Sequence, residues 1–522
     1  MKISGKNIIG FKKSGKGRRT FTGITANAVA DAPAFKIAAP SEVNTAMQKA
    51  QEAFQTYRHF TGSHKAKFLR AIAEEIEHLG DQLIDAAMTE AGLPEGRVRG
   101  ERGRTMGQLR LFADHVEEGS WVNAIIETAI PERKPFPKAD IRTMYQPMGP
   151  VVVFTASNFP LAFSTAGGDT ASALASGCPV VVKGHEAHPV TNELVSSAIQ
   201  KAAKKTGMPD GVFSMLNGDY KTGGALVKHE LTAAVAFTGS LQGGRALFDI
   251  ANKRSNPIPV FAEMGSVNPV IILQGARDQW GNEIAKTLAG SVALGAGQFC
   301  TNPGLVFVPE NGHEAFADAL ASAMQAANGQ CMLNNNIFNN YFKRLEHALA
   351  QNGVKAIQLS KGSKSENVLP SAGIAAAETF LANPELREEV FGPFTLLVTY
   401  QNGEELVRLI KAMNGQLTAT VYGEKHELGH QLNLINELNQ IAGRLIINGV
   451  PTGVEVCHAM QHGGPYPAST DGRFTSVGTE AIKRFVRPVC YQNFPIELLP
   501  AALQDRNPLG IWRKVNGEFV QS

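Results

Sequence analysis

The fold class is decided by one stretch, Val151-Val152-Val153-Phe154-Thr155-Ala156-Ser157-Asn158-Phe159-Pro160, which joins a short apolar strand to a polar loop. Similar apolar runs follow at residues 180–182, 211–213 and 234–237, and helix-like segments separate them. Apolar strands that alternate with helices at this spacing predict a parallel sheet covered by helices on both faces. Such sheets bind ligands at the carboxyl ends of their strands. We therefore expect an α/β fold with a binding site near the loop that carries Asn158.

The regions on either side of this stretch extend the same prediction. Upstream, residues 41–130 are rich in alanine and charged residues, and Phe68, Ile72 and Ile76 recur at steps of four, which predicts helices. A proline-containing segment at 131–137 interrupts them. Downstream, a second α/β alternation spans about 259–450. Its expected strands are residues 270–273, 305–308, 395–399 and 444–448.

Composition excludes several classes of protein. The chain has 522 residues, which predicts two or three domains, and its 50 Lys and Arg nearly balance its 47 Asp and Glu, which argues against a dedicated nucleic-acid binder. Its five cysteines are scattered, so we expect no disulfide framework and a reducing compartment. The basic stretch from Lys2 to Arg19 has no apolar segment after it, and we interpret it as a solvated edge rather than a targeting signal. We expect a cytoplasmic protein that binds neither membrane nor nucleic acid.

The pentapeptide His426-Glu427-Leu428-Gly429-His430 raises the alternative of a zinc hydrolase. In such enzymes two histidines one helical turn apart bind the metal, and the glutamate activates its water. The metzincin continuation is missing here, and Gly429 weakens the helix that the motif needs. We therefore prefer an exposed helix start after a strand at 418–422, and we expect no metal.

A second candidate centre is Cys300, in the sequence Gly295-Ala296-Gly297-Gln298-Phe299-Cys300-Thr301. Small residues let a substrate approach the thiol, and a position that opens a helix would lower the pKa of the thiol. A simply buried cysteine is the alternative. Four other motifs favour the chemical interpretation: the Asn158 loop, Phe237-Thr238-Gly239-Ser240 with Gly244, Glu263-Met264-Gly265, and Glu389-Val390-Phe391-Gly392-Pro393.

With these five motifs in this order, nearly the whole chain resembles the aldehyde dehydrogenase superfamily. The resemblance implies that the Cys300 thiolate attacks an aldehyde carbon and that the Asn158 amide and the Cys300 backbone N–H hold the resulting oxyanion. Loss of hydride to the nicotinamide then leaves a thioester. Glu263 is implied as the general base for the hydrolytic water.

The resemblance also implies a site for NAD(P). Glu389 and Phe391 match the residues that hold the nicotinamide ribose and ring, Lys183 and Glu186 those at the adenosine ribose, and Ser240 lies near the pyrophosphate. The remaining residues implied at the cofactor are Phe154, Thr155, Phe237, Thr238, Gly239, Gly244, Met264 and Gly265. A carboxylate at position 186 would repel a 2′-phosphate, so we expect NAD to be preferred over NADP, although Lys183, His185 and Arg245 could favour the phosphate.

Departures from the common pattern indicate the branch. Ala156 and Ser157 stand where a tryptophan often precedes the asparagine, and residues 460–468 replace the usual C-terminal glycine-rich block. Together with residues 298–304 and 487–492, this block resembles the branch of the 2-oxoglutarate semialdehyde (2,5-dioxopentanoate) dehydrogenases. Long-chain fatty aldehyde dehydrogenases are the alternative. His458 and His462, in or beside this block, could form a metal pair or act as a base, but we expect them to satisfy local backbone groups.

The substrate is expected to meet Arg104 and Gln108, four residues apart on a predicted helix, together with Asn158 and Phe299. The planar guanidinium of Arg104 suits the distal carboxylate of a dioxo acid. The alternative is that Arg104 only pairs with Glu101 on a solvated face of the helix.

The resemblance also implies two Rossmann-type α/β domains and a β-arm, and hence a homodimer or homotetramer. Residues 1–132 with 150–258 would bind the cofactor, residues 259–470 would form the catalytic domain, and residues 133–149 with 483–500 would form the arm.

Overall fold

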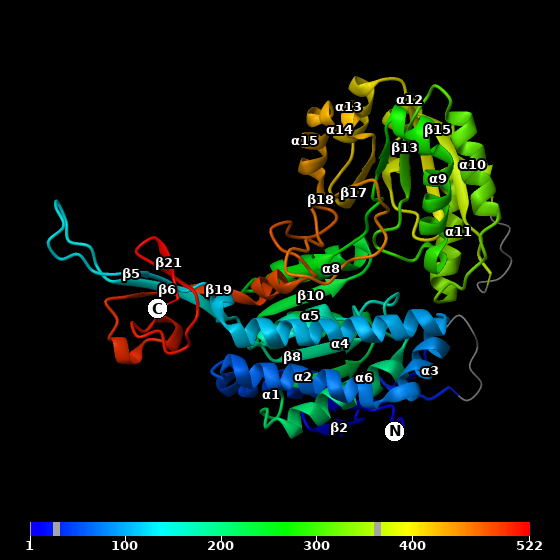
Figure 1. The fold of residues 1–522 in the computed structure, drawn as a ribbon. Helices are drawn as coiled ribbons and strands as arrows, with labels where there is room; N and C mark the ends of the chain where they lie inside the picture. Colours follow the sequence, from blue (N-terminus) through cyan, green and yellow to red (C-terminus); the bar gives the residue numbers. More distant parts are fainter. Residues whose placement is uncertain (1, 25–31, 360–366, 522) are drawn as a thin grey trace.

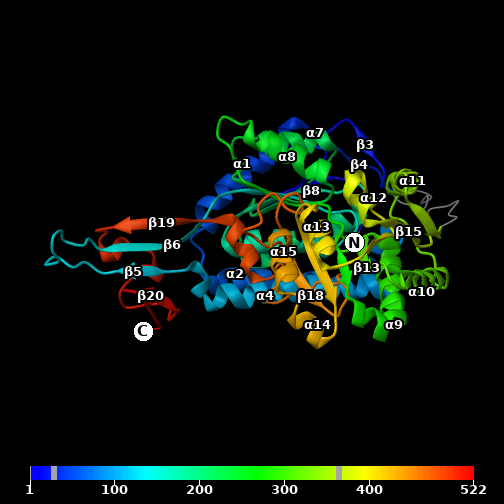
Figure 2. The same ribbon diagram turned by 90° about the horizontal axis from the view of Figure 1, so that it is seen from above.

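The computed structural model describes residues 2–24, 32–359 and 367–521. Two seven-stranded sheets, each wrapped by helices, lie one above the other, and a narrow five-stranded arm projects away from both (Figures 1 and 2). The predicted α/β class is confirmed. No helix in the described ranges is long and apolar enough to cross a membrane.

The first sheet has the strand order β11-β10-β7-β8-β9-β1-β2, in which β7 to β11 run parallel and β1 and β2 form an antiparallel edge. Its strands are β1 (Asn7–Ile9), β2 (Lys12–Ser14), β7 (Val151–Phe154), β8 (Val180–Gly184), β9 (Phe213–Asn217), β10 (Ala234–Thr238) and β11 (Val260–Glu263). Its helices are α1 (Pro40–Tyr57), α2 (Gly62–His78), α3 (Gly80–Ala91), α4 (Glu95–Glu118), α5 (Gly168–Ser176), α6 (Pro189–Lys205), α7 (Tyr220–Lys228) and α8 (Leu241–Asn252).

Both faces of this sheet are covered because side chains alternate along each strand. Val151 and Val153 pack into the core formed with α2, α4, α5 and α6, whereas Val152 packs into the core formed with α1, α7 and α8. Figure 2 shows these two helix layers on opposite sides of the sheet. The all-apolar sequence of β7 follows from this double burial.

The second sheet has the order β14-β15-β16-β13-β12-β17-β18 and is parallel except for β14. Its strands are β12 (Val270–Ile272), β13 (Leu305–Pro309), β14 (Lys355–Gln358), β15 (Ser371–Ala376), β16 (Phe394–Tyr400), β17 (Gln416–Tyr422) and β18 (Ala442–Ile447). Its helices are α9 (Gln274–Ala293), α10 (His313–Gln325), α11 (Asn335–Leu349), α12 (Ala377–Ala382), α13 (Gly403–Lys411), α14 (Lys425–Gly429) and α15 (Leu432–Ile441). Helices α9 and α10 cover one face, and α11, α12, α13 and α15 cover the other.

The arm is a five-stranded sheet in the order β19-β6-β5-β20-β21. These strands are β5 (Ile125–Glu127), β6 (Ile141–Pro147), β19 (Val486–Gln492), β20 (Arg513–Val515) and β21 (Glu518–Val520). A buried ion pair of 2.7 Å between Arg484 and Asp169 fastens the base of the arm to α5. A two-stranded ribbon of β3 (Thr20–Phe21) and β4 (Phe35–Lys36) completes the strands.

Three details differ from the sequence-based expectations. The helix-like segment expected directly after residues 151–160 begins as a helix only at Gly168, because residues 160–167 form turns beside the loop that carries Asn158. Strand β11 pairs with β10, so the first sheet extends past residue 258, where the sequence placed a domain boundary. The arm was expected to end at residue 500, but β20 and β21, which lie beyond that residue, also belong to it.

Candidate active site

Cys300 lies at the end of a strained loop between the two sheets. The 3₁₀ turn η2 (Leu294–Gly297) contains three consecutive residues with positive φ, at 58° for Gly295, 52° for Ala296 and 66° for Gly297. A side chain at Gly297 would lie 2.2 Å from the Gly392 carbonyl, so only glycine permits the two backbones to approach here. Ala296 tolerates this conformation at a cost of about 1–3 kcal/mol, which the surrounding contacts must outweigh.

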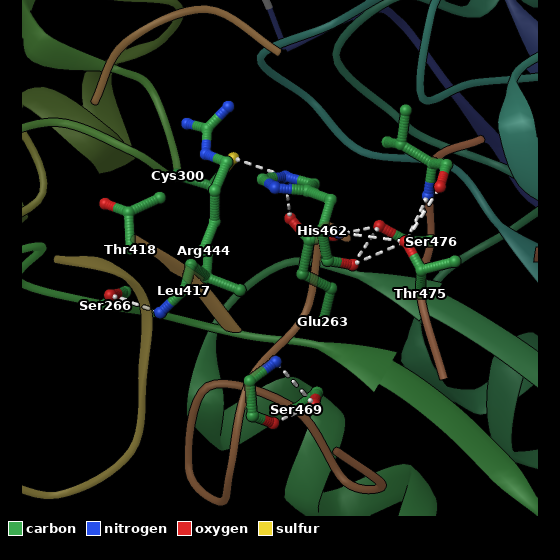
Figure 3. A network of polar contacts seen from close by, with 12 residues as sticks. Glu263, Ser266, Cys300, Leu417, Thr418, Arg444, His462, Ser469, Thr475 and Ser476 are labelled. Atoms are coloured by element: carbon green, nitrogen blue, oxygen red, sulfur yellow. Dashed lines mark hydrogen bonds and ion pairs between the residues drawn. The ribbon is translucent and has the colours of Figure 1, made fainter. Parts of the chain in front are cut away.

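The thiol of Cys300 faces His462 and Glu263 (Figure 3). His462 Nε2 lies 3.5 Å from Cys300 Sγ and 2.9 Å from Glu263 Oε1. The Ser476 hydroxyl donates to the other carboxylate oxygen, and both Glu263 and His462 are almost fully buried. A nucleophile, an imidazole and a carboxylate are thus within reach of proton exchange.

Two pKa shifts follow from this packing. Burial raises the pKa of Cys300 well above its ordinary value, and the negative charge of Glu263 raises it further. Burial also tends to raise the pKa of Glu263, but attraction and hydrogen bonding from His462, with hydrogen bonds from Ser476 and Cys300, outweigh it and lower that pKa. The expected lowering of the thiol pKa by a helix start is not found, because Cys300 lies in a turn.

The sequence did not predict the position of His462. This residue was expected, like His458, to satisfy local backbone groups. His458 Nδ1 lies 3.1 Å from the Thr479 hydroxyl. The ring of His462 instead contacts Cys300 and Glu263, which are distant from it in the chain. Its Nδ1 is buried without a hydrogen-bond partner. The one available signal was its position in the atypical block 460–468.

The same trio has the spacing of a metal site, since one donor atom from each of Glu263, Cys300 and His462 lies within 4.8 Å of the others. It is the one group of this kind among the described residues. Two of its donors are already joined by the 2.9 Å contact between His462 and Glu263. These contacts also suit the exchange of a proton among the three groups.

Asn158 lies beside the nucleophile loop, as the sequence predicted. It follows β7 in the polar loop, and its Nδ2 donates to the Gln298 carbonyl at 3.0 Å, two residues before Cys300. One N–H of the amide remains for another acceptor. A side-chain amide beside a thiol is the kind of donor that stabilises an oxyanion on the attacked carbon.

Helix α4 places Arg104 and Gln108 at a cavity of about 570 Å³, whose opposite wall includes Val454 and Val456. The Arg104 guanidinium lies over the Phe163 ring at 5.1 Å, and its Nη2 is buried without a hydrogen-bond partner. Gln108 is 2% exposed, and its Nε2 is likewise unpaired. Both groups are therefore unsatisfied donors beside a space that a ligand can enter.

The alternative for Arg104, an ion pair with Glu101 on a solvated face, does not match its surroundings. Glu101 is 4% exposed and accepts the backbone N–H groups of Leu161 and Ala162, at 2.9 Å each. Burial lowers the pKa of Arg104, while Glu101, Cys300 and Glu263 act in the opposite direction. Phe299 lies elsewhere: its ring packs against Phe159 and forms part of a second pocket that includes Glu389 and Phe391.

Most of the residues implied at the cofactor lie at or just after the carboxyl ends of β7, β8, β10 and β11, whereas Gly244 lies in α8 and Glu389 and Phe391 precede β16 of the second sheet. Ser240 caps α8 by accepting the Gly243 N–H at 3.1 Å, and it is exposed at the helix N-terminus, where anions are favoured. A side chain at Gly244 would lie 2.6 Å from Met264 Sδ, so glycine lets α8 lie close on the sheet. Lys183 is surrounded by protein, and burial lowers its pKa while Glu186 opposes this.

The other members of this set line the same region. Thr155 Oγ1 accepts the His185 N–H at 2.6 Å, and Phe154 packs edge-to-face on Phe237 with centroids 6.1 Å apart. Glu389 lies against Gly265, where an added side chain would lie 2.3 Å from the carboxylate, and burial raises the pKa of Glu389 to about 7. These residues fit a dinucleotide, because a free helix N-terminus suits its pyrophosphate and the carboxylate can accept from a ribose hydroxyl.

The motif His426-Glu427-Leu428-Gly429-His430 has a structural explanation. Glu427 accepts the backbone N–H groups of Gly275 and Ala276 at 2.7 and 3.2 Å, and so caps the N-terminus of α9. The motif occupies the five-residue helix α14 and its C-terminal cap, as the preferred interpretation of an exposed helix start after β17 requires. His426 faces Glu424 at 3.1 Å.

Comparison with known proteins matches the chain to one family. The sequence model of the aldehyde dehydrogenase family matches residues 8–488. Alpha-ketoglutaric semialdehyde dehydrogenase 2 of Azospirillum brasilense is 49% identical over 491 residues, covering 94% of this chain and 94% of that protein. Alpha-ketoglutaric semialdehyde dehydrogenase of Acinetobacter baylyi is 46% identical over 491 residues, covering 94% and 93%.

Solved structures share the fold at lower identity. Methylmalonate-semialdehyde dehydrogenase from Oceanimonas doudoroffii has a TM-score of 0.79 at 19% identity, covering 94% of this chain and 98% of that one. Betaine aldehyde dehydrogenase from Staphylococcus aureus, in complex with NAD+, has a TM-score of 0.80 at 18% identity, covering 94% and 96%. From the family match and the two relatives at 46–49% identity, the chain belongs to the aldehyde dehydrogenase family, whose members oxidise aldehydes with NAD(P).

Proposed function

We propose that this aldehyde dehydrogenase converts 2-oxoglutarate semialdehyde to 2-oxoglutarate. The observation that carries the proposal is Arg104, which lines the cavity at α4 and whose buried Nη2 has no hydrogen-bond partner, in a chain whose relatives at 46–49% identity are named for this substrate. A buried guanidinium without a partner is costly, and a substrate carboxylate would remove that cost. The apolar chain of a fatty aldehyde would leave it in place.

In the proposed reaction, the Glu263 carboxylate takes the thiol proton of Cys300, and His462 stabilises the carboxylate from 2.9 Å. The thiolate sulfur then bonds to the aldehyde carbon, and the carbonyl oxygen becomes an oxyanion that accepts from the Asn158 amide and the Cys300 backbone N–H. The residues at the carboxyl ends of β7, β8 and β10 would hold NAD(P)+, which would supply the acceptor for the hydride that leaves the adduct carbon, so that a thioester remains.

Glu263 serves a second time in hydrolysis. After its first proton has been released to solvent, the carboxylate removes a proton from a water molecule, and the resulting hydroxide attacks the thioester carbon. The carbon–sulfur bond breaks, the carboxylate product leaves, and Cys300 regains a proton. The hydrogen bond from Ser476 and the contact with His462 hold Glu263 for both tasks.

For the substrate, Arg104 would pair with the distal carboxylate, and Gln108 Nε2 would supply a second donor one helical turn away. Arg104→Ala is expected to raise KM for 2-oxoglutarate semialdehyde and to spare an uncharged aldehyde of similar length. Arg99→Ala, an exposed arginine on the same helix, is the matched control. Equal loss with both aldehydes in the Arg104 variant would contradict the assignment.

For the cofactor, we infer a preference for NAD over NADP. Glu186 lies close enough to Lys183 for its negative charge to oppose the lowering of the Lys183 pKa by burial. A carboxylate at position 186 accepts a hydrogen bond from a 2′-hydroxyl but repels a 2′-phosphate. The measurement is kcat/KM with each dinucleotide. A higher value with NADP would contradict the inference.

We further propose that the first sheet and its helices bind the cofactor, that the second carries the nucleophile, and that the arm joins subunits into a homodimer or homotetramer. Strand β19 is a sheet edge, and Phe136, Leu498 and Phe519 on or beside the arm are largely exposed, as a partner surface requires. The five cysteines are scattered along the chain rather than spaced as a disulfide framework, which supports a cytoplasmic location. Light scattering during size-exclusion chromatography would give the subunit number.

The experiment that tests the function is a substrate panel with both cofactors: 2-oxoglutarate semialdehyde, succinate semialdehyde, glutaraldehyde and long-chain aldehydes. The dioxo acid is expected to give the highest kcat/KM, and Cys300→Ala is expected to abolish all turnover. A higher value with a long-chain aldehyde would favour the fatty aldehyde alternative. Turnover that survives Cys300→Ala would refute the thiol mechanism.

A further inference from the structure

We propose that Arg97 is a positioning residue that locks the Cys300 loop and the Asn158 loop to each other before substrate binds. The inference rests on the proposed roles of Cys300 and Asn158 and adds a residue from α4 that touches neither of them.

Arg97 lies against two aromatic rings that also contact each other, one from each loop. Its guanidinium carbon is 4.8 Å from the centroid of Phe159, the residue after Asn158, and 4.6 Å from the centroid of Phe299, the residue before Cys300. The two rings also contact each other edge-to-face, with centroids 5.4 Å apart. One planar cation thus joins the immediate neighbours of the oxyanion donor and of the nucleophile.

Glu101, one turn further along α4, holds both Arg97 and the Asn158 loop. Its Oε2 lies 3.6 Å from Arg97 Nε, while its Oε1 accepts from the backbone N–H groups of Leu161 and Ala162. Because Glu101 is 4% exposed, this anchor is fixed by packing as well as by charge. The loop that carries Asn158 is therefore attached to α4 at two places, through the ring of Phe159 and through the backbone of residues 161–162.

On the other side, Arg97 and Phe299 brace the strained turn before the nucleophile. A side chain added at Gly295 would lie 2.7 Å from the Phe299 ring and 3.5 Å from Arg97 Nη1, so both groups fold back on this turn. Three consecutive positive φ angles persist only where surrounding contacts over-determine the backbone. The stacked Arg97 supplies such a contact, together with the Gln330 side chain, which accepts the Gly295 N–H at 2.7 Å.

The position of Arg97 is difficult to explain as packing alone. Its Nη2 is buried without a hydrogen-bond partner, and burial lowers its pKa. An apolar side chain would fill the same space without this cost. What an apolar chain lacks is a positive charge that the π systems of both rings attract.

The test separates attack on a carbonyl from reactivity of the thiol. Hydrolysis of p-nitrophenyl acetate needs both the thiolate and the oxyanion donor but no dinucleotide, whereas alkylation by iodoacetamide needs the thiolate alone. In Arg97→Met we expect kcat for ester hydrolysis and for aldehyde oxidation to fall together by about 10- to 100-fold. Alkylation of Cys300 and KM for NAD are expected to stay within about threefold of wild type.

Two further variants complete the design. Arg97→Lys keeps the charge but lacks the planar face, so it is expected to recover little of the lost kcat. Should Arg97→Met fail to fold, Arg97→Lys decides the question by the same measurements. Arg99→Met, an exposed arginine on the same helix, is the matched control and is expected to behave as wild type.

Three outcomes would overturn the proposal. Unchanged ester hydrolysis in both Arg97 variants would mean that the stack positions nothing. Alkylation that falls as far as ester hydrolysis would mean a general disturbance of the thiol. Loss confined to 2-oxoglutarate semialdehyde, with a neutral aldehyde spared, would make Arg97 a substrate carboxylate receptor. Wild-type protein that neither hydrolyses the ester nor oxidises any aldehyde would instead contradict the proposed function itself.

Discussion

Replacing Glu263 by glutamine is expected to change two reactions of Cys300 in opposite directions. The carboxylate is the base proposed for both proton removals, so aldehyde oxidation should fall. The same carboxylate raises the pKa of the Cys300 thiol, so its removal should make the thiol more reactive toward an alkylating agent at neutral pH. Few other roles for Glu263 predict both a fall in aldehyde oxidation and a rise in thiol alkylation.

The size of the second effect follows from the separation of the two groups. Cys300 Sγ and the nearest Glu263 oxygen lie within 4.8 Å. Two unit charges at that separation repel by about 3 kcal/mol at an effective dielectric constant of about 20. This corresponds to a gain of about two to three hundredfold in thiolate below the pKa of the thiol, and relaxation of the neighbours is expected to leave a gain of at least about tenfold.

The assay is the second-order rate of Cys300 alkylation by iodoacetamide as a function of pH, followed by mass spectrometry of the peptide. Because a thiol is deprotonated as pH rises through its pKa, the alkylation rate should rise with pH in both proteins. The rise should occur at lower pH in Glu263→Gln than in wild type, and the two rates should become equal at high pH. Glu389→Gln is the matched comparison, with a smaller increase expected because Glu389 is a weaker influence on the thiol. Alkylation of Glu263→Gln that is no faster than wild type at neutral pH would refute the reasoning.

Three further outcomes are expected. Asn158→Ala removes one oxyanion donor and should lower kcat by about 10²- to 10³-fold in steady-state assays, and an undiminished kcat would exclude that role. Since burial raises the pKa of Glu389 to about 7, KM for the dinucleotide should increase as the carboxylate is protonated below that pH, and Glu389→Gln should make KM independent of pH. Glu427→Ala should cost about 1 kcal/mol in urea unfolding, because α9 loses its cap, and should leave aldehyde oxidation intact.

Much of the fold was predictable because the relevant signals are local. The apolar strands at 151–154, 180–182 and 234–237 alternate with helices, and the structure places all three in one parallel sheet. The predicted strands of the second sheet are present as well. Boundaries were less predictable where a loop serves the site, as in residues 160–167, whose backbone bonds to Glu101 rather than continuing into a helix.

For the candidate site, too, the sequence predicted the residues of local motifs but not the contacts between distant residues. Sequence alone determined the family, because five short motifs in order identify it, and with it the residues Cys300, Asn158 and Glu263. Only the tertiary structure decided that His462 lies against Cys300, 162 positions away, and that Arg97 joins the rings of Phe159 and Phe299. It also decided that the thiol pKa is raised rather than lowered, because burial beside Glu263 outweighs any effect of the local backbone. Motifs record which groups are present, whereas contacts, burial and charge separation arise only when two sheets pack against each other.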